Sequence, residues 1–147
     1  MAGQTRISPI RLTCGHLFNC SPDQLCREPF MFENLEVYQK AVDFADNIAA
    51  LTQSFPRGYY FLVDQLNRAA LSIPTNLAEG NGRFTKPDRK NYFTIARGSV
   101  QECVPLVVIA RRRRLIDDQA ALNLRERLEI VAKMISGLIK GLDKREV

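Results

Sequence analysis

The sequence predicts an all-α protein whose architecture is an up-down-up-down antiparallel four-helix bundle. From residue 35 onward, apolar residues recur at alternating spacings of four and three positions, which is the period of a helix that presents one stripe to helical neighbours. Breaks at proline and glycine divide this pattern into four long segments with short connections. Short connections between long helices make consecutive helices antiparallel. No alternating run typical of a strand competes with this pattern.

The first two segments are separated by Pro56 and Gly58. Proline breaks a helix because its ring fixes φ and removes the N–H, and glycine does so through its excess freedom. The first predicted helix begins near Leu35, and its stripe consists of Val37, Ala41, Phe44, Ile48, Leu51 and Phe55. The second has Leu62, Leu66, Ala69 and Ile73, with Asn76 and Gly80 in the same register. It ends at the sequence Gly80-Asn81-Gly82.

The third and fourth segments begin at residues that favour helix starts. The third begins near Pro87, a good first-turn residue, and its stripe consists of Tyr92, Ala96, Ser99, Cys103, Leu106 and Ala110. The fourth follows Asp117, an expected N-cap, and its stripe consists of Leu124, Leu128, Val131, Ile135, Leu138 and Leu142. We expect each of the four helices to span roughly 20 to 27 residues, about 30 to 40 Å.

Residues 1–30 differ in kind from the rest, because they mix Pro, Cys, Ser and Asn without a helical period. We predict that residues 1–30 are a disordered or non-native N-terminal extension, with Met31 as the alternative start. Residues 31–142 then form the bundle and residues 143–147 a C-terminal tail. A zinc cluster is the less favoured interpretation of the extension, because no common finger spacing is matched by Cys14, His16, Cys20 and Cys26.

The hydropathy pattern bears on the cellular location. No stretch approaches 18 consecutive apolar residues, so we expect no membrane-spanning helix and no membrane partner. The first thirty residues also lack the continuous apolar region of a secretory signal. The expected location is therefore cytoplasmic.

The residue content argues against an enzyme. The chain of 147 residues has a single histidine, His16, so the predicted bundle has none. Di-iron bundles need Glu-x-x-His motifs, and a nucleophilic cysteine at Cys103 would need a histidine base. Cys103 also lies on the apolar stripe, where a buried inert thiol is the usual case. We therefore predict no catalytic residues, no metal and no cofactor.

Three strings are more specific than the periodicity. They are Phe32-Glu-Asn-Leu-Glu-Val-Tyr-Gln-Lys-Ala41, Arg68-Ala-Ala-Leu-Ser-Ile-Pro-Thr-Asn-Leu-Ala-Glu-Gly80 and Ile95-Ala-Arg-Gly-Ser-Val-Gln-Glu102. Their order and spacing resemble the four-helix-bundle proteins encoded in intervening sequences of 23S rRNA genes, the S23 family, over about residues 31–142. The resemblance implies a small basic bundle similar to pentamer-forming relatives. It also implies a link to RNA or to retroelement accessory proteins.

Polar residues on the predicted stripes need an explanation, because a buried polar group without a partner costs roughly 1 to 3 kcal/mol. Asn76 and Ser99 occupy such positions. One interpretation is a structural polar network across helices that fixes their register. The alternative is a convergent ligand or partner site; both involve Asn76, Glu79, Arg97, Ser99 and Glu102. An ion pair between Glu79 and Arg97 fits antiparallel helices, and Gly80 and Gly98 fit close helix approach or helix termination.

Positive charge is concentrated around the third helix. Residues 83–114 contain nine basic and two acidic residues, a net charge of +7, whereas the whole chain carries +5. Four consecutive arginines project around the whole helix circumference and cannot all pair with one acidic neighbour. We predict phosphate contacts of RNA from two clusters, which are Arg83, Lys86, Arg89 and Lys90 at one end and Arg111, Arg112, Arg113 and Arg114 at the other. Stacking surfaces on Tyr59, Tyr60, Tyr92 or Phe93 are a weaker expectation than core or subunit contacts for these rings.

Two functional hypotheses remain open. The first is a non-enzymatic, oligomeric helical-bundle protein that binds structured, ribosomal-RNA-related RNA. The alternative is a structural or accessory protein that acts through self-assembly and a protein partner, such as a retroelement accessory subunit. A homo-oligomer is expected because the apolar arcs are wider than a bundle seam needs, through Ile95, Val100, Val107, Val108 and Ile109 and through Ile130, Ala132 and Ile139. The resemblance suggests a pentamer.

Overall fold

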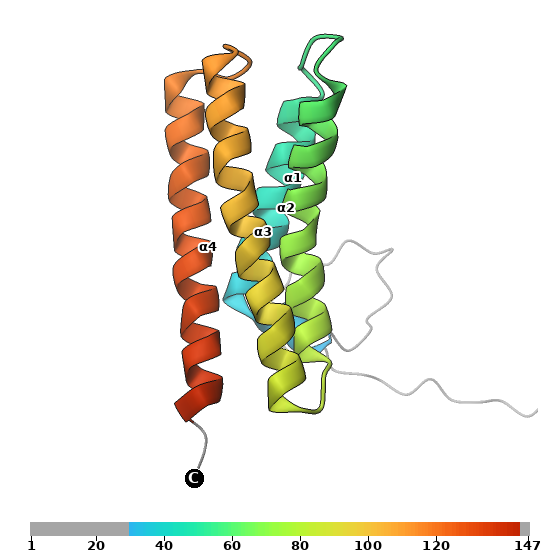
Figure 1. Cartoon of the computed structure of the whole chain (residues 1–147), viewed down its shortest axis with the longest axis vertical. Coiled ribbons are helices and arrows are strands. Elements are labelled where there is room, and N and C mark those ends of the chain that lie inside the picture. The colour runs from blue at the N-terminus through green and yellow to red at the C-terminus, as the bar shows by residue number, and fades with distance from the viewer. Residues whose placement is uncertain (1–29, 145–147) are drawn as a thin grey trace, which may run out of the picture.

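Four antiparallel helices follow a short 3-10 helix in the computed structural model, which describes residues 30–144 (Figure 1). The elements are η1 (Met31–Asn34), α1 (Glu36–Thr52), α2 (Tyr60–Asn81), α3 (Lys86–Arg112) and α4 (Asp118–Lys144). No strand occurs within residues 30–144. This arrangement confirms the predicted all-α four-helix bundle. Residues 1–29 and 145–147 lie outside this range and contain most of the predicted extension and tail, which stay predictions.

The helix ends follow local hydrogen bonding. The Thr85 hydroxyl accepts a bond from the Asp88 N–H at 3.3 Å, and Pro87 lies in the first turn of α3, as predicted. The Asp117 carboxylate accepts from the Ala120 N–H at 2.6 Å, which confirms Asp117 as a cap of α4. The predicted tail boundary is two residues too early, because α4 continues through Lys144.

The first helix is shorter than predicted. Helix α1 has 17 residues and ends at Thr52, before Phe55. The Thr52 hydroxyl donates to the Ile48 carbonyl at 2.9 Å and accepts from the Asn67 side-chain amide of α2 at 2.9 Å. Phe55 lies in the connection to α2 but still packs against the core. The apolar period therefore correctly predicted that Phe55 contacts the core, but it wrongly placed Phe55 within the first helix.

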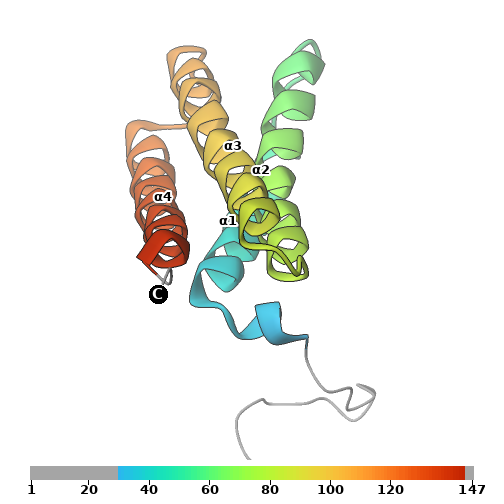
Figure 2. The same ribbon diagram turned by 60° about the horizontal axis from the view of Figure 1, so that its bottom comes forward.

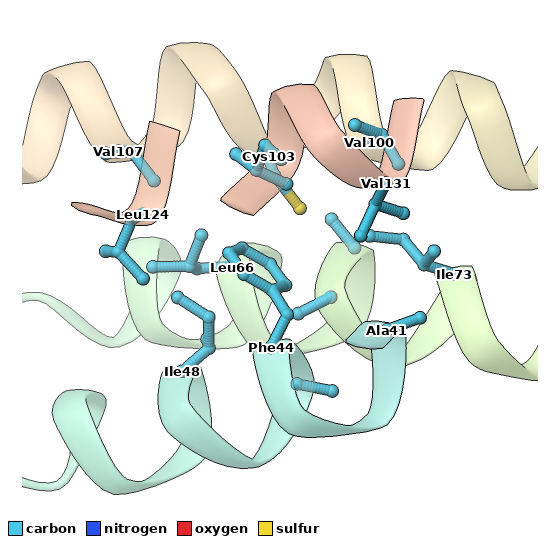
Figure 3. Close-up of a cluster of buried hydrophobic side chains, with 14 of the residues drawn as sticks. Ala41, Phe44, Ile48, Leu66, Ile73, Val100, Cys103, Val107, Leu124 and Val131 are labelled. Carbon is cyan, nitrogen blue, oxygen red and sulfur yellow. The ribbon is translucent and has the colours of Figure 1, made fainter. Parts of the chain in front are cut away.

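One core joins all four helices. Figure 3 shows Phe44 of α1 pointing into a cluster to which α2, α3 and α4 also contribute side chains. The predicted register in α3 is wrong at two positions, because Phe93 and Val107 are buried where Tyr92 and Leu106 were expected. Helix α3 packs against both α2 and α4, so its buried arc is wider than a single stripe. Tyr92 and Leu106 lie at the edge of this arc and are half-buried.

Figure 2 shows α3 between α2 and α4; α2 and α3 make the most extensive pair of helices and α1 and α4 the least. Near the C-terminal end of α2, Gly80 permits the close approach of α2 and α3, because a Cβ at this position would lie 2.8 Å from the ring of Phe93. Close approach at Gly80 is thus confirmed. Gly98 has no such role, because nothing lies within 4 Å of a Cβ built there.

The length and composition of α3 bear on the predicted absence of a membrane-spanning helix, which stays a prediction. By length and composition alone, α3 is long and apolar enough to cross a membrane. The core helix of a bundle passes the same test, and the buried side chains of α3 pack into the shared core. A helix of a packed bundle can therefore meet the length and hydropathy criteria of a membrane span without containing a continuous apolar run.

Candidate nucleic-acid interface

The two predicted basic clusters lie at opposite ends of the bundle. Arg83 to Lys90 occupy the α2–α3 connection and the start of α3, and Arg111 to Arg114 occupy the last turn of α3 and the start of the α3–α4 connection (Figure 1). We call them the amino-end cluster and the arginine tract, respectively. The 27 residues of α3 separate the two ends by about 40 Å. A ligand that contacts both must therefore be long.

Three residues of the arginine tract are available for a ligand. Arg111 is paired, because its Nε donates to the Asp118 carboxylate at 2.5 Å. Arg112, Arg113 and Arg114 are exposed, and within residues 30–144 their side chains have no ion-pair or hydrogen-bonding partner. The prediction that the four arginines cannot all pair locally is confirmed.

The backbone at the end of α3 holds Arg114 in an unusual conformation. Its φ is 58°, in the left-handed region that favours glycine. The Arg114 N–H donates to the Arg111 carbonyl and the Leu115 N–H to the Ala110 carbonyl, both at 2.9 Å, which is the Schellman pattern of a helix end. Leu115 packs against the core, so the turn is anchored. The left-handed residue costs roughly 1 to 2 kcal/mol relative to a right-handed one.

Two cations of the amino-end cluster, Arg83 and Lys90, form ion pairs with carboxylates of the bundle. Arg83 pairs with Glu79 and donates to the Tyr92 hydroxyl at 2.7 Å, and its guanidinium lies 4.7 Å from the centroid of the Tyr92 ring. Lys90 pairs with Asp143 of α4 at 2.7 Å. These pairs are solvent-exposed, and such pairs contribute only about 0 to 1 kcal/mol. Phosphate groups can therefore compete for both cations.

Arg89 is the least accessible of the predicted phosphate contacts. It is half-buried, and its guanidinium approaches the Asn81 carbonyl and side-chain oxygens at only 3.4 and 3.5 Å. Its Nε is buried without a partner. The side chain lines a hollow of about 530 Å³ together with Leu35, Phe93 and Leu142. Arg89 therefore belongs to the bundle interior more than to an external surface.

The predicted polar network is smaller than expected and includes a residue that the sequence did not indicate. The Asn76 amide donates to the Ser72 carbonyl at 2.7 Å and to the Ser72 hydroxyl at 3.0 Å. The hydroxyls of Ser72 and Ser99 lie 2.8 Å apart and join α2 to α3. Ser72 provides the link, and its position beside the apolar stripe gave no signal of this role.

The other three residues of that predicted network are elsewhere. Glu102 pairs with Arg68 at 2.7 Å, and Glu79 pairs with Arg83, so the predicted ion pair between Glu79 and Arg97 is wrong. Arg97 lies on the side of α3 that faces α4, whereas Glu79 lies one turn before Arg83 near the end of α2.

The structure reveals two features that the sequence reasoning missed. One is a hollow of about 430 Å³ between α3 and α4, which includes Arg97, Lys133 and Lys140 among its lining residues. The other is Phe84, which is fully exposed in the α2–α3 connection. Of the four rings weighed as stacking surfaces or core contacts, Phe93 is buried, Tyr59 and Tyr92 are half-buried, and Tyr60 is exposed. Composition counts aromatic rings but does not show which of them a loop exposes.

Among residues 30–144, the titratable side chains provide no activated nucleophile. Cys103 is fully buried, as predicted, and burial together with nearby Glu102 raises the pKa of its thiol to about 12. Lys133 lowers the pKa of Glu129, chiefly through a hydrogen bond on the exposed face of α4. Within residues 30–144, no three histidine, cysteine, aspartate or glutamate side chains are grouped as metal ligands. The suggested zinc ligands Cys14, His16, Cys20 and Cys26 lie outside the described residues.

Comparisons with known proteins identify relatives of the chain. A crystal structure of a protein of unknown function from the S23 ribosomal protein family of Bacteroides thetaiotaomicron matches with a TM-score of 0.67 and 21% identity. The match covers 71% of this chain and 98% of that one, which shows the shared fold. No curated protein matches. The sequence model of the 23S rRNA-intervening sequence proteins matches residues 33–137, most of the bundle, and the chain therefore belongs to that family.

Proposed function

We propose that this protein is a non-enzymatic, cytoplasmic RNA-binding bundle that contacts the phosphates of a structured RNA. The observation that carries the proposal is the group Arg112, Arg113 and Arg114, three exposed cations without partners in the described chain. Arginine binds phosphate through paired N–H donors, and such contacts add affinity without reading the sequence. The family's description, 23S rRNA-intervening sequence protein, favours ribosomal-RNA-related RNA as the ligand class.

The conformation of Arg114 supports the same proposal. A glycine would occupy the left-handed position at lower cost, yet the chain has a charged residue there. Within residues 30–144 its side chain makes no hydrogen bond or ion pair that would explain this choice. A residue that is locally unfavourable and has no structural partner is expected where binding benefits from it.

A salt-dependent titration tests the phosphate contacts. A labelled RNA stem-loop is titrated with the full chain and with a variant in which Arg112, Arg113 and Arg114 are all serine. The matched control replaces three ion-paired cations with serine, namely Lys40, Arg68 and Lys133. Both variants lose three charges, so they separate the tract from net charge.

We expect the affinity of the full chain to fall steeply with salt. The tract variant should bind more weakly, and its slope of log affinity against log salt should be shallower by about 2. The control variant should lose much less affinity. Affinity that does not change with salt, or an equal loss in both variants, contradicts the proposed contacts.

Self-assembly with a protein partner, for example as a retroelement accessory subunit, is the second candidate function. It is favoured by an apolar hollow of about 290 Å³ between α3 and α4, lined by Val104, Val108 and Leu122 among others. Leu122 is 50% exposed, and Ile95, Ile109 and Ile130 are exposed as well. Apolar surface of this kind marks association sites when it is contiguous. The proposed assembly is a homo-oligomer, with five copies as the expected number.

Mass measurement by light scattering, with and without nuclease treatment, tests this second function. An oligomer that persists after nuclease treatment supports assembly through protein contacts. A variant with Leu122→Gln should then dissociate, whereas Val42→Gln on the outer face of α1 should not. A monomer mass for the untreated chain at micromolar concentration contradicts assembly.

A further inference from the structure

The α2–α3 connection exposes an aromatic ring that phosphate contacts do not use. The side chain of Phe84 is 103% exposed, so its ring contacts nothing else in the bundle. It lies between Asn81, where α2 ends, and Lys86, where α3 begins. Single exposed apolar residues are common on protein surfaces, so exposure alone indicates no function. The surroundings of the ring provide the further observation.

Cations flank the ring on both sides. Arg83 precedes Phe84 directly, and Lys86 follows two residues later; both are exposed. The start of α3 adds the partial positive charge of a helix N-terminus. Thr85 and Asp88 close the first turn at this end, with the hydroxyl of Thr85 2.6 Å from the Asp88 carboxylate. The ring therefore protrudes from a short connection flanked by two cations, and the exposed pair of Arg83 with Glu79 is weak enough for a phosphate to compete with it.

We propose that Phe84 stacks on an unpaired nucleobase while Arg83 and Lys86 contact the phosphates on either side of it. This inference rests on the proposed function and narrows its ligand to RNA with a single-stranded segment. Aromatic rings that alternate with cations are the usual platform for unpaired bases. A base inside a duplex is covered on both faces by its neighbours, so a protruding ring reaches only an unpaired or terminal one.

Other occupants suit this connection less well. Insertion into a membrane needs several apolar side chains at one place, and the neighbours of Phe84 are Arg83 and Thr85. A second copy of the chain would need an anionic surface with room for the ring. The most acidic helix, α1, presents Asp43 and Asp46 beside Val42, and none of the three hollows described above is lined by residues of α1. A single-stranded nucleic acid provides both the negative charge that the flanking cations attract and a flat apolar surface on which the ring can stack.

Tryptophan fluorescence tests the stacking directly. The chain contains no tryptophan, so Phe84→Trp introduces a single reporter at the proposed site. The probes are an oligouridylate of about 12 nucleotides and an RNA duplex of the same length. Val42→Trp is the matched control, because Val42 is exposed on an acidic part of α1. We expect the oligouridylate to quench the reporter at position 84 and to leave the reporter at position 42 unchanged.

Affinity measurements add a second readout. Phe84→Ala is expected to weaken oligouridylate binding about tenfold, which is within the range for loss of one stacking contact. Phe84→Tyr keeps a ring and should retain most of the affinity. Duplex binding should change less than about twofold in either variant, because it depends on phosphate contacts. Since the ring has no contacts in the bundle, both variants should keep the wild-type melting temperature.

The outcomes separate this inference from the proposed function. Salt-dependent RNA binding without quenching at position 84 overturns the stacking and leaves the phosphate contacts standing. Equal quenching by duplex and oligouridylate also overturns it. A fluorescence change on anionic lipid vesicles alone, or on raising the protein concentration alone, assigns the ring to a membrane or to self-association instead. If the full chain binds no RNA at all, both proposals fail.

Discussion

Arg114 places a positive charge at a strained backbone position. Its effect on bundle stability and its effect on RNA affinity can be measured separately. Replacement by glycine removes the Cβ strain of φ 58°. We expect Arg114→Gly to stabilise the bundle by about 1 kcal/mol, seen as a rise of a few degrees in the melting temperature. Arg113 has φ −81°, so Arg113→Gly should not stabilise. Both variants should bind RNA more weakly, and equal melting temperatures for the two would contradict the strain.

The thiol of Cys103 reports on the integrity of the core. In a variant with Cys14, Cys20 and Cys26 replaced by serine, we expect a thiol reagent to label Cys103 only at the rate at which the bundle opens. The reason is that the side chain is fully buried and its pKa is raised to about 12. Full labelling in denaturant is the control. Rapid labelling of the folded chain would contradict the position of Cys103.

The same pKa shift predicts how stability depends on pH. The unfolded thiol has an ordinary pKa of 9.0 and the folded one about 12. The folded state therefore retains the proton more tightly, and its advantage is complete below about pH 9 and is lost as the pH rises toward 12. Urea unfolding should show a loss of about 1 kcal/mol between roughly pH 8 and 10. Cys103→Ala should lack this part of the loss.

At the scale of helices, the approach of α2 to α3 depends on a missing side chain. We expect Gly80→Ala to destabilise the bundle by about 1 to 3 kcal/mol, because the new Cβ would lie 2.8 Å from a buried ring. Gly98→Ala is the control, because its Cβ meets nothing, and it should stabilise by up to about 1 kcal/mol. Urea unfolding measures both, and a neutral Gly80→Ala would mean that the Phe93 ring moves freely.

The helices could largely be predicted from the sequence because each carries a long apolar period and a clear break. The same period could not give the exact buried arc of a helix with two neighbours. In α3 it selected Tyr92 over Phe93, since the two differ by one position on a wide arc. The period also could not give the end of α1, because Thr52 at that end accepts a hydrogen bond from Asn67 of α2.

At the scale of the whole molecule, the charge pattern located both basic ends, but only the structure shows which cations are available. The charge pattern predicts Arg89 and Arg112 to Arg114 alike as phosphate contacts. In the structure, Arg112, Arg113 and Arg114 are exposed, whereas Arg89 is half-buried. Whether a cation is available for a ligand depends on the direction in which its side chain leaves the helix, because that direction decides whether it meets a neighbouring helix. For the same reason, the sequence did not show that Arg97 lies on the side of α3 that faces α4.

The division of the chain into extension and bundle gives the final prediction. All buried apolar residues of the described core lie between Val37 and Ile135. We therefore expect a chain that begins at Met31 to keep the helix content, melting temperature and RNA affinity of the full chain. The prediction includes affinity because residues 1–30 carry only three basic and two acidic residues. Circular dichroism and the stem-loop titration measure these properties.

A chain that begins at Glu36 is the matched comparison, because it also removes η1. In η1 the ring of Phe32 packs edge-on against Tyr38 of α1, with centroids 5.0 Å apart, and such a pair contributes about 0.5 to 1.5 kcal/mol beyond its buried area. This shorter chain should melt several degrees lower, as expected for a small domain that loses one aromatic contact and the area it covers. If the chain beginning at Met31 loses as much stability, residues 1–30 contribute to the fold and the domain boundary lies upstream of Met31.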